Sequence, residues 1–114
     1  MDPREPAQIL TVLHDAIDQL DSHRLRSEIQ RRIITPVLER RFFQTGTGDA
    51  QGDLWLFLIL QDRNVALAYS DEGYGSLGMR WGLVFLHGDQ YGDSGGWYNS
   101  LRDLLVDSGY FEAD

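Results

Sequence analysis

The apolar residues near the start of the chain recur every three or four positions. Ile9, Leu13 and Ile17 mark this stripe, and acidic and amide side chains fall on the opposite side. A period close to 3.6 residues gathers the apolar side chains on one face of an α-helix. The pattern therefore predicts a first amphipathic helix that begins after Pro6.

A second helical stripe follows directly. Leu25, Ile29 and Ile33 repeat at four-residue spacing, and Ser22 stands just before them. Serine is a favoured N-cap because its hydroxyl oxygen accepts a hydrogen bond from a free N–H group of the first turn. The sequence predicts a second helix that begins after Ser22.

Pro36 interrupts this second stripe. Proline lacks a backbone donor and disfavours helical geometry at the preceding residue, Thr35. A threonine cap followed by proline is also typical of a helix start. With Val37, Leu38 and Phe42 continuing the apolar spacing, we expect the helix to restart here.

Residues 45–53 read TGTGDAQGD and have the composition of a linker. The segments on either side are too short to fold independently. We therefore interpret this stretch as the change from helical to strand periodicity within a single domain, residues 1–114.

Three strand-like segments follow, at about 54–60, 65–70 and 81–86, and then a helical stripe at about 97–108. Short turns and glycine-rich loops connect them. The order of elements predicts an α+β fold with N-terminal helices, a three-stranded antiparallel meander and a C-terminal helix.

The first of these strands, LWLFLIL at residues 54–60, is apolar on both faces. Such a strand is stable in water only when both of its faces are covered. Helices on both sides would cover it, and so would a second copy of the chain. A homodimer is therefore one of the two arrangements that the strand predicts.

The chain has 114 residues and a net charge of −8. This charge argues against nucleic-acid and anionic-membrane partners. The N-terminal segment has no apolar signal-peptide core, and the longest apolar run is far shorter than a bilayer span. We expect a cytoplasmic protein.

Several catalytic and metal-binding patterns are incomplete. The absence of cysteine excludes disulfides, thiol nucleophiles and cysteine-ligated zinc, and the absence of lysine excludes a P-loop. His14 and Asp18 stand four apart without further ligands. Asp89 and Asp93 lack the spacing of a calcium loop. We predict no cofactor, no metal and no enzymatic activity.

The string GDSGG at residues 92–96 resembles the segment around the catalytic serine of chymotrypsin-like proteases, with Ser94 at the nucleophile position. The resemblance covers five residues of a chain about half the length that this fold needs. Trp97 follows where the family has proline. We interpret the string as a glycine-rich loop in which Asp93 or Ser94 caps the last helix.

Two loops combine carboxylates with tyrosine and glycine. We predict that they bind a partner protein through Asp71, Glu72, Tyr74, Asp89, Tyr91 and Asp93. Acidic groups beside tyrosine are typical of surfaces that bind basic proteins. In a meander, the two loops are expected to leave opposite ends of the third strand and to stay apart.

These features favour a small acidic protein that masks or inhibits a basic partner protein, comparable in character to toxin-immunity proteins and inhibitors. One alternative is a dimeric protein like a secretion chaperone, which would use exposed apolar surface. Another is a small-molecule-binding domain with its cleft near Arg80, Trp81 and His87.

Overall fold

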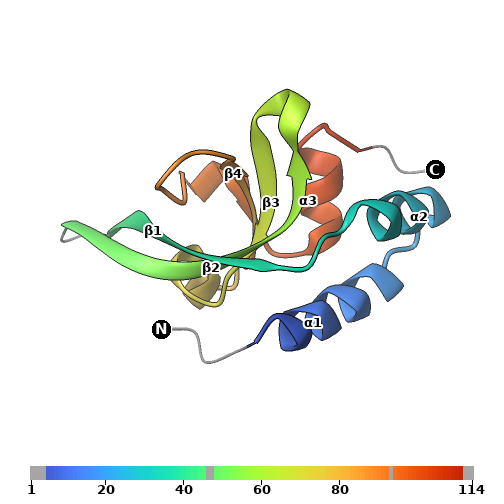
Figure 1. Ribbon diagram of the computed structural model, residues 1–114, viewed down its shortest axis with the longest axis horizontal. Helices are drawn as coiled ribbons and strands as arrows, with labels where there is room; N and C mark the ends of the chain where they lie inside the picture. Colours follow the sequence, from blue (N-terminus) through green and yellow to red (C-terminus); the bar gives the residue numbers. More distant parts are fainter. Residues whose placement is uncertain (1–4, 46–47, 93, 112–114) are drawn as a thin grey trace.

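The computed structural model describes residues 5–45, 48–92 and 94–111. Figure 1 shows the order of the elements along the chain, which is α1 (Pro6–Asp18), α2 (His23–Arg32), β1 (Val37–Thr45), β2 (Gly48–Leu60), β3 (Val65–Tyr69), β4 (Trp81–Phe85), β5 (Trp97–Tyr98) and α3 (Leu101–Asp107). All neighbouring strands are antiparallel, and the sheet follows chain order from β1 to β5. The predicted α+β meander is confirmed, with five strands instead of three.

The two N-terminal helices form where their apolar stripes predict them. The hydroxyl oxygen of Ser22 accepts a hydrogen bond from the N–H of Leu25 at 3.1 Å, so Ser22 is the N-cap of α2. The stripes of α1 and α2 are buried against the sheet. No helix in the described residues is both long and apolar enough to cross a bilayer.

The predicted helix restart after Pro36 is wrong, because residues 37–45 form strand β1. Leu38 and Phe42 are four residues apart, a spacing that a helix and a strand both place on one face. The strand is selected by its long-range pairing with β2, which aligns Val37 with Leu56 and continues to the hairpin turn.

Of the predicted linker at residues 45–53, Thr45 ends β1 and residues 48–53 belong to β2, the second arm of a β1–β2 hairpin, while residues 46–47 fall outside the described part of the chain. Strand β2 begins at Gly48, six residues before the predicted start at Leu54. The hairpin projects away from the helices in Figure 1. The second half of β2 pairs with β3 from Trp55 onward, and a bulge at Phe57 shifts the register of that pairing.

The last helix is shorter than predicted. Trp97 and Tyr98 pair with β4 as the short strand β5, and α3 begins only at Leu101. Its N-cap is Ser100, whose hydroxyl accepts from the N–H of Asp103 at 3.1 Å. Capping by Ser94 is therefore wrong, since Ser100 caps the helix and Ser94 lies in a separate 3₁₀ turn. Asp93, the other predicted cap, falls outside the described residues.

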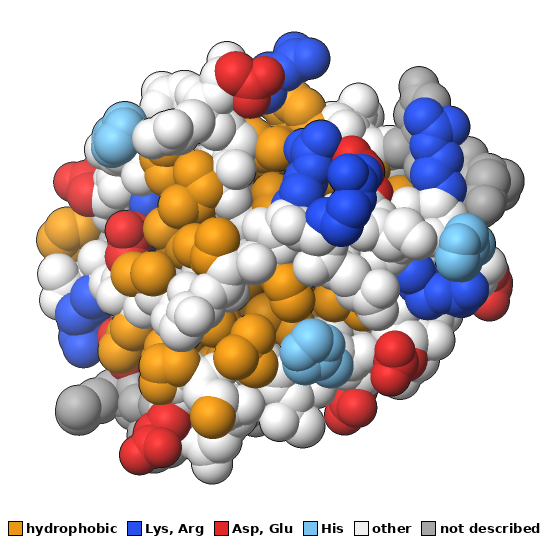
Figure 2. Space-filling model, turned by 45° about the vertical axis from the view of Figure 1, so that its right-hand side comes forward, with side chains coloured by type: hydrophobic (Ala, Val, Ile, Leu, Met, Phe, Trp, Pro, Cys, Tyr) orange, Lys and Arg blue, Asp and Glu red, His pale blue; other side chains and the backbone are white. Residues whose placement is uncertain are grey.

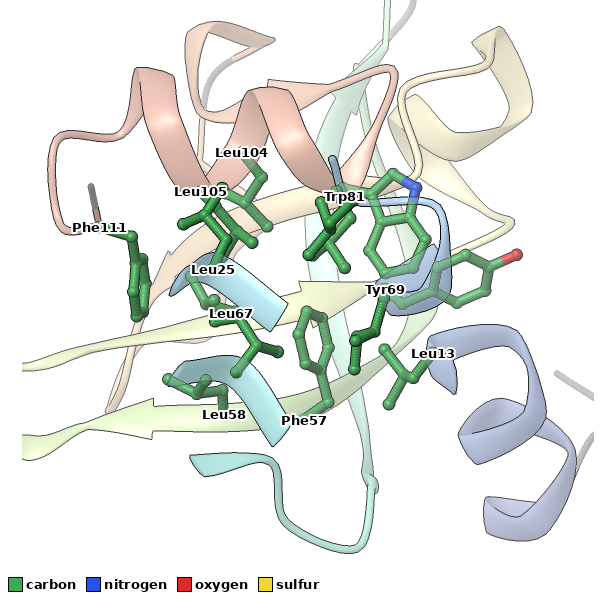
Figure 3. Close-up of a cluster of buried hydrophobic side chains, with 14 of the residues drawn as sticks. Leu13, Leu25, Phe57, Leu58, Leu67, Tyr69, Trp81, Leu104, Leu105 and Phe111 are labelled. Carbon is green, nitrogen blue, oxygen red and sulfur yellow. The ribbon is translucent and has the colours of Figure 1, made fainter. Parts of the chain in front are cut away.

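The three helices cover one face of the sheet and enclose the larger core. Figure 3 shows Phe57 and Tyr69 from the sheet pointing toward Trp81, with Leu13 of α1 and Leu104 of α3 on either side. Phe57 and Trp81 meet edge-to-face, with ring centroids 5.9 Å apart. The helices therefore cover one of the two faces of the strand Leu54–Leu60.

The opposite face of the sheet is covered by loops of the same chain. Leu54 and Leu56 pack there with Tyr91 and Trp97, which come from the segment after β4. The ring of Tyr91 stacks on that of Trp97 at 5.1 Å. Leu54 and Leu56 are thus covered by loops of the same chain, without helices on that side and without a second copy, an arrangement that the sequence reading did not consider. Ile59, further along β2, stays 38% exposed.

Candidate functional site

The two acidic loops meet inside the protein. The hydroxyls of Ser70 and Tyr91 both donate to the backbone oxygen of Asp53, at 2.6 and 2.8 Å, and lie 2.9 Å from each other. The hydroxyl of Tyr74 donates to the backbone oxygen of Gly92 at 3.1 Å. The prediction that these loops stay apart is wrong, because the connection after β4 is long enough to return across the sheet.

The predicted partner-binding acids of the first loop have intramolecular partners. The Asp71 carboxylate accepts from the hydroxyl of Tyr69 at 3.0 Å and from Nε of Arg80 at 3.2 Å. The Glu72 carboxylate accepts from the N–H of Asp53, beside the end of β3. These contacts tie the loop to the sheet, so both acids have a structural role.

The other predicted residues divide in three ways. Tyr91 is fully buried and cannot present its ring to a partner, and Tyr74 is half-buried against it. Asp89 is exposed. Asp93 falls outside the described residues.

The hydroxyl of Tyr91 gives a direct test of this buried junction. Tyr91→Phe should lower the free energy of unfolding by about 1–2 kcal/mol, because Ser70 loses its buried neighbour and Asp53 one of two donors. Urea denaturation followed by tryptophan fluorescence measures the loss. Tyr98→Phe, which removes a hydroxyl without a partner in the described part of the chain, should cost less than about 0.5 kcal/mol.

The predicted small-molecule cleft near Arg80, Trp81 and His87 does not form as one site. Arg80 is held by Asp71, and His87 is exposed beyond the far end of β4. Trp81 instead lines a groove between α1 and the start of α3. Within residues 5–45, 48–92 and 94–111, no three histidine or acidic side chains gather in a way that could hold a metal ion.

The outer edge of β1 is the surface that the sequence reading missed. The N–H of Phe42 donates to the oxygen of Asp89 at 2.9 Å, and the oxygen of Phe42 accepts from the N–H of Tyr91 at 2.8 Å. Phe42 therefore directs its backbone groups away from β2. Because this direction alternates along an antiparallel strand, the backbone groups of Arg40 and Leu38 also point outward.

The segment 89–91 pairs with β1 only at Phe42. In the described part of the chain, no group bonds the outward N–H and C=O of Leu38 and Arg40. The β1 edge, residues 37–41, is thus a stretch of extended backbone with free donors and acceptors. Edge strands of this kind are templates for pairing with another strand.

Apolar side chains flank the β1 edge. Val37, Leu38 and Phe42 are 48%, 42% and 38% exposed. Figure 2 shows one face of the molecule, on which exposed apolar side chains gather among charged ones. The guanidinium of Arg40 is turned toward β2, where Nε donates to the side chain of Gln51 at 3.1 Å. The edge therefore offers both backbone hydrogen bonds and apolar contact.

No protein-family model, curated protein or solved structure matches this chain.

Proposed function

We propose that the protein binds another protein by pairing an extended segment of that partner with the β1 edge, and so masks the partner. The observation that carries the proposal is the outward, unbonded backbone of Leu38 and Arg40. An added strand gains main-chain hydrogen bonds there, while alternate side chains supply specificity.

We expect the partner to bind through an extended segment, because an extended segment of this chain already pairs with the same edge. Residues 89–91 pair in parallel with β1 at Phe42 and stop there, which leaves the outward backbone groups of Leu38 and Arg40 without a neighbouring strand in the described part of the chain. A partner segment of about four residues fits this stretch, since successive residues of a strand advance about 3.3 Å. An apolar side chain of the partner would lie beside Leu38.

The charge of the protein favours a basic partner. The net charge is −8, and long-range attraction between opposite charges speeds association. The exposed acids Asp15, Asp18, Asp62 and Asp107 contribute to this field. In this proposal they take the place of Asp71 and Glu72, whose carboxylates are engaged in intramolecular contacts, as the source of the long-range attraction.

Arg40→Pro tests the proposal, because proline removes the outward N–H of residue 40 and leaves the β1–β2 ladder intact. Tagged wild type, Arg40→Pro and the matched control Arg40→Ala would each be used for affinity purification from the source cell. Arg40→Pro should lose the partner at least tenfold more than Arg40→Ala. In the purified complex, the amides of Leu38 and Arg40 should exchange with solvent more slowly than in the free protein.

Two results would overturn the proposal. Equal recovery of the partner with Arg40→Pro and Arg40→Ala would place the partner elsewhere. A concentration-dependent dimer that Arg40→Pro abolishes would show that a second copy occupies the edge, as in the chaperone-like alternative. Light scattering distinguishes the two.

A further inference from the structure

A groove lies between α1 and the start of α3, with a volume of about 500 Å³. Ligand pockets typically measure roughly 300–1,000 Å³. In Figure 3, Trp81 lies between the start of α3 and α1. The α1–α3 groove lies at a different place from the β1 edge, so its role is independent of the proposed function.

The floor of the groove is apolar. Trp81, Leu20 and Leu101 form it and are almost fully buried, while Val12 and Ala16 of α1 are half-buried at its side. Trp81 is held firmly by its ring contacts with Phe57 and Tyr69. The floor is therefore a fixed surface suited to an apolar group.

The walls of the groove carry one charge of each sign. Asp15 comes from α1, and within the described residues its carboxylate has no ion pair or hydrogen bond. Arg102 comes from α3, and its described contact is a distant one, 3.7 Å to the neighbouring Asp103. An exposed pair at this distance contributes little, so Arg102 can bind another anion at small cost.

Amide side chains complete the polar part of the walls. Gln19 lies one helical turn from Asp15, and Asn99 precedes the α3 cap. Each amide offers both a donor and an acceptor. The groove thus combines an apolar floor, a cation-binding wall, an anion-binding wall and neutral hydrogen-bonding groups.

We infer that the α1–α3 groove binds a small zwitterion with an apolar body, of the class of an apolar α-amino acid or dipeptide. Its ammonium group binds the carboxylate of Asp15, and its carboxylate binds the guanidinium of Arg102. The apolar side chain rests on Trp81 and Leu101. Opposite charges on the two walls favour a ligand that carries both charges over one that carries either alone.

The test uses L-phenylalanine and L-leucine as probes, with Nα-acetyl-L-phenylalanine and L-phenylalanine amide as analogues that each lack one charge. The readout is the indole N–H resonance of Trp81, assigned with Trp81→Phe. At least one amino acid should shift this resonance saturably. The two analogues should bind at least tenfold more weakly, because each leaves one wall unpaired.

Two variants complete the test, together with a control that changes the net charge by the same amount as Asp15→Asn. Asp15→Asn and Arg102→Gln should each weaken binding about tenfold, while Asp62→Asn, at an exposed residue outside the groove, should leave it unchanged. The inference is overturned if neither amino acid shifts the Trp81 resonance, or if the analogues bind as well as their parent. Neither result bears on pairing at the β1 edge, which Arg40→Pro tests separately.

Discussion

Replacing Arg41 with methionine should cost about 3–5 kcal/mol of unfolding free energy. The Arg41 side chain is only 1% exposed. Its Nη1 donates to the backbone oxygens of Phe85 and Gln90, at 2.8 and 3.2 Å. Its Nε donates to the Glu39 carboxylate at 2.8 Å. One guanidinium thus joins β1 to the end of β4 and to the returning loop.

The expected loss is large because methionine fills the space of Arg41 but satisfies none of these acceptors. Buried carbonyl groups without donors carry their full desolvation cost. Urea denaturation gives the free energy of unfolding. The control is Arg40→Met, at the neighbouring and exposed arginine, which should cost less than about 1 kcal/mol. If the two variants lose equal stability, the buried guanidinium does not hold the three segments together.

The parts of the fold that could be predicted are those determined by neighbouring residues. Ser22 caps α2 because its partner, the N–H of Leu25, is three residues away. The same holds for the apolar stripe of α1 and for the two-sided strand of residues 54–60, in which the apolar run predicts the burial of every residue except Ile59, which is 38% exposed. The sequence therefore predicted the α+β class and the order of its main elements.

The β1 strand shows why the rest could not be predicted. The spacing of Leu38 and Phe42 fits the period of a helix and also that of a strand. Only the pairing of Val37 with Leu56 therefore distinguishes the strand from a helix. That pairing is set by the whole hairpin. Because a helix was predicted after Pro36, the candidate site could not be predicted either, since the β1 edge exists only if residues 37–45 are extended.

The loops were misread for a similar reason. Asp71, Glu72 and Tyr91 have the composition of a solvent-exposed recognition surface, but their partners are Arg80, Asp53 and other residues distant in sequence. No local pattern distinguishes a tyrosine that binds a partner from one that covers a sheet. The length of the connection after β4 was the available signal, since it is sufficient to cross the second face.

Gly75 offers a comparable test of the first loop, at the residue that follows Tyr74 in its 3₁₀ turn. A Cβ atom added to Gly75 would overlap the backbone oxygen of Ser70. This carbonyl cannot move aside easily, because the Ser70 N–H donates to the oxygen of Arg80 at 2.9 Å and its hydroxyl to Asp53. We expect Gly75→Ala to cost roughly 3 kcal/mol, as for an overpacked core position.

The matched control is Gly78→Ala, three residues further along the same loop. A Cβ atom at Gly78 meets nothing within 4 Å, although its φ of +94° is unfavourable for alanine. That variant should lose only about 1 kcal/mol, from backbone strain. Both changes add one methyl group, and only Gly78 carries the strain of a positive φ, so the difference in unfolding free energy is a lower bound on the cost of the clash with Ser70. Equal losses would mean that the loop at Gly75 does not pack against the backbone of Ser70 at the end of β3.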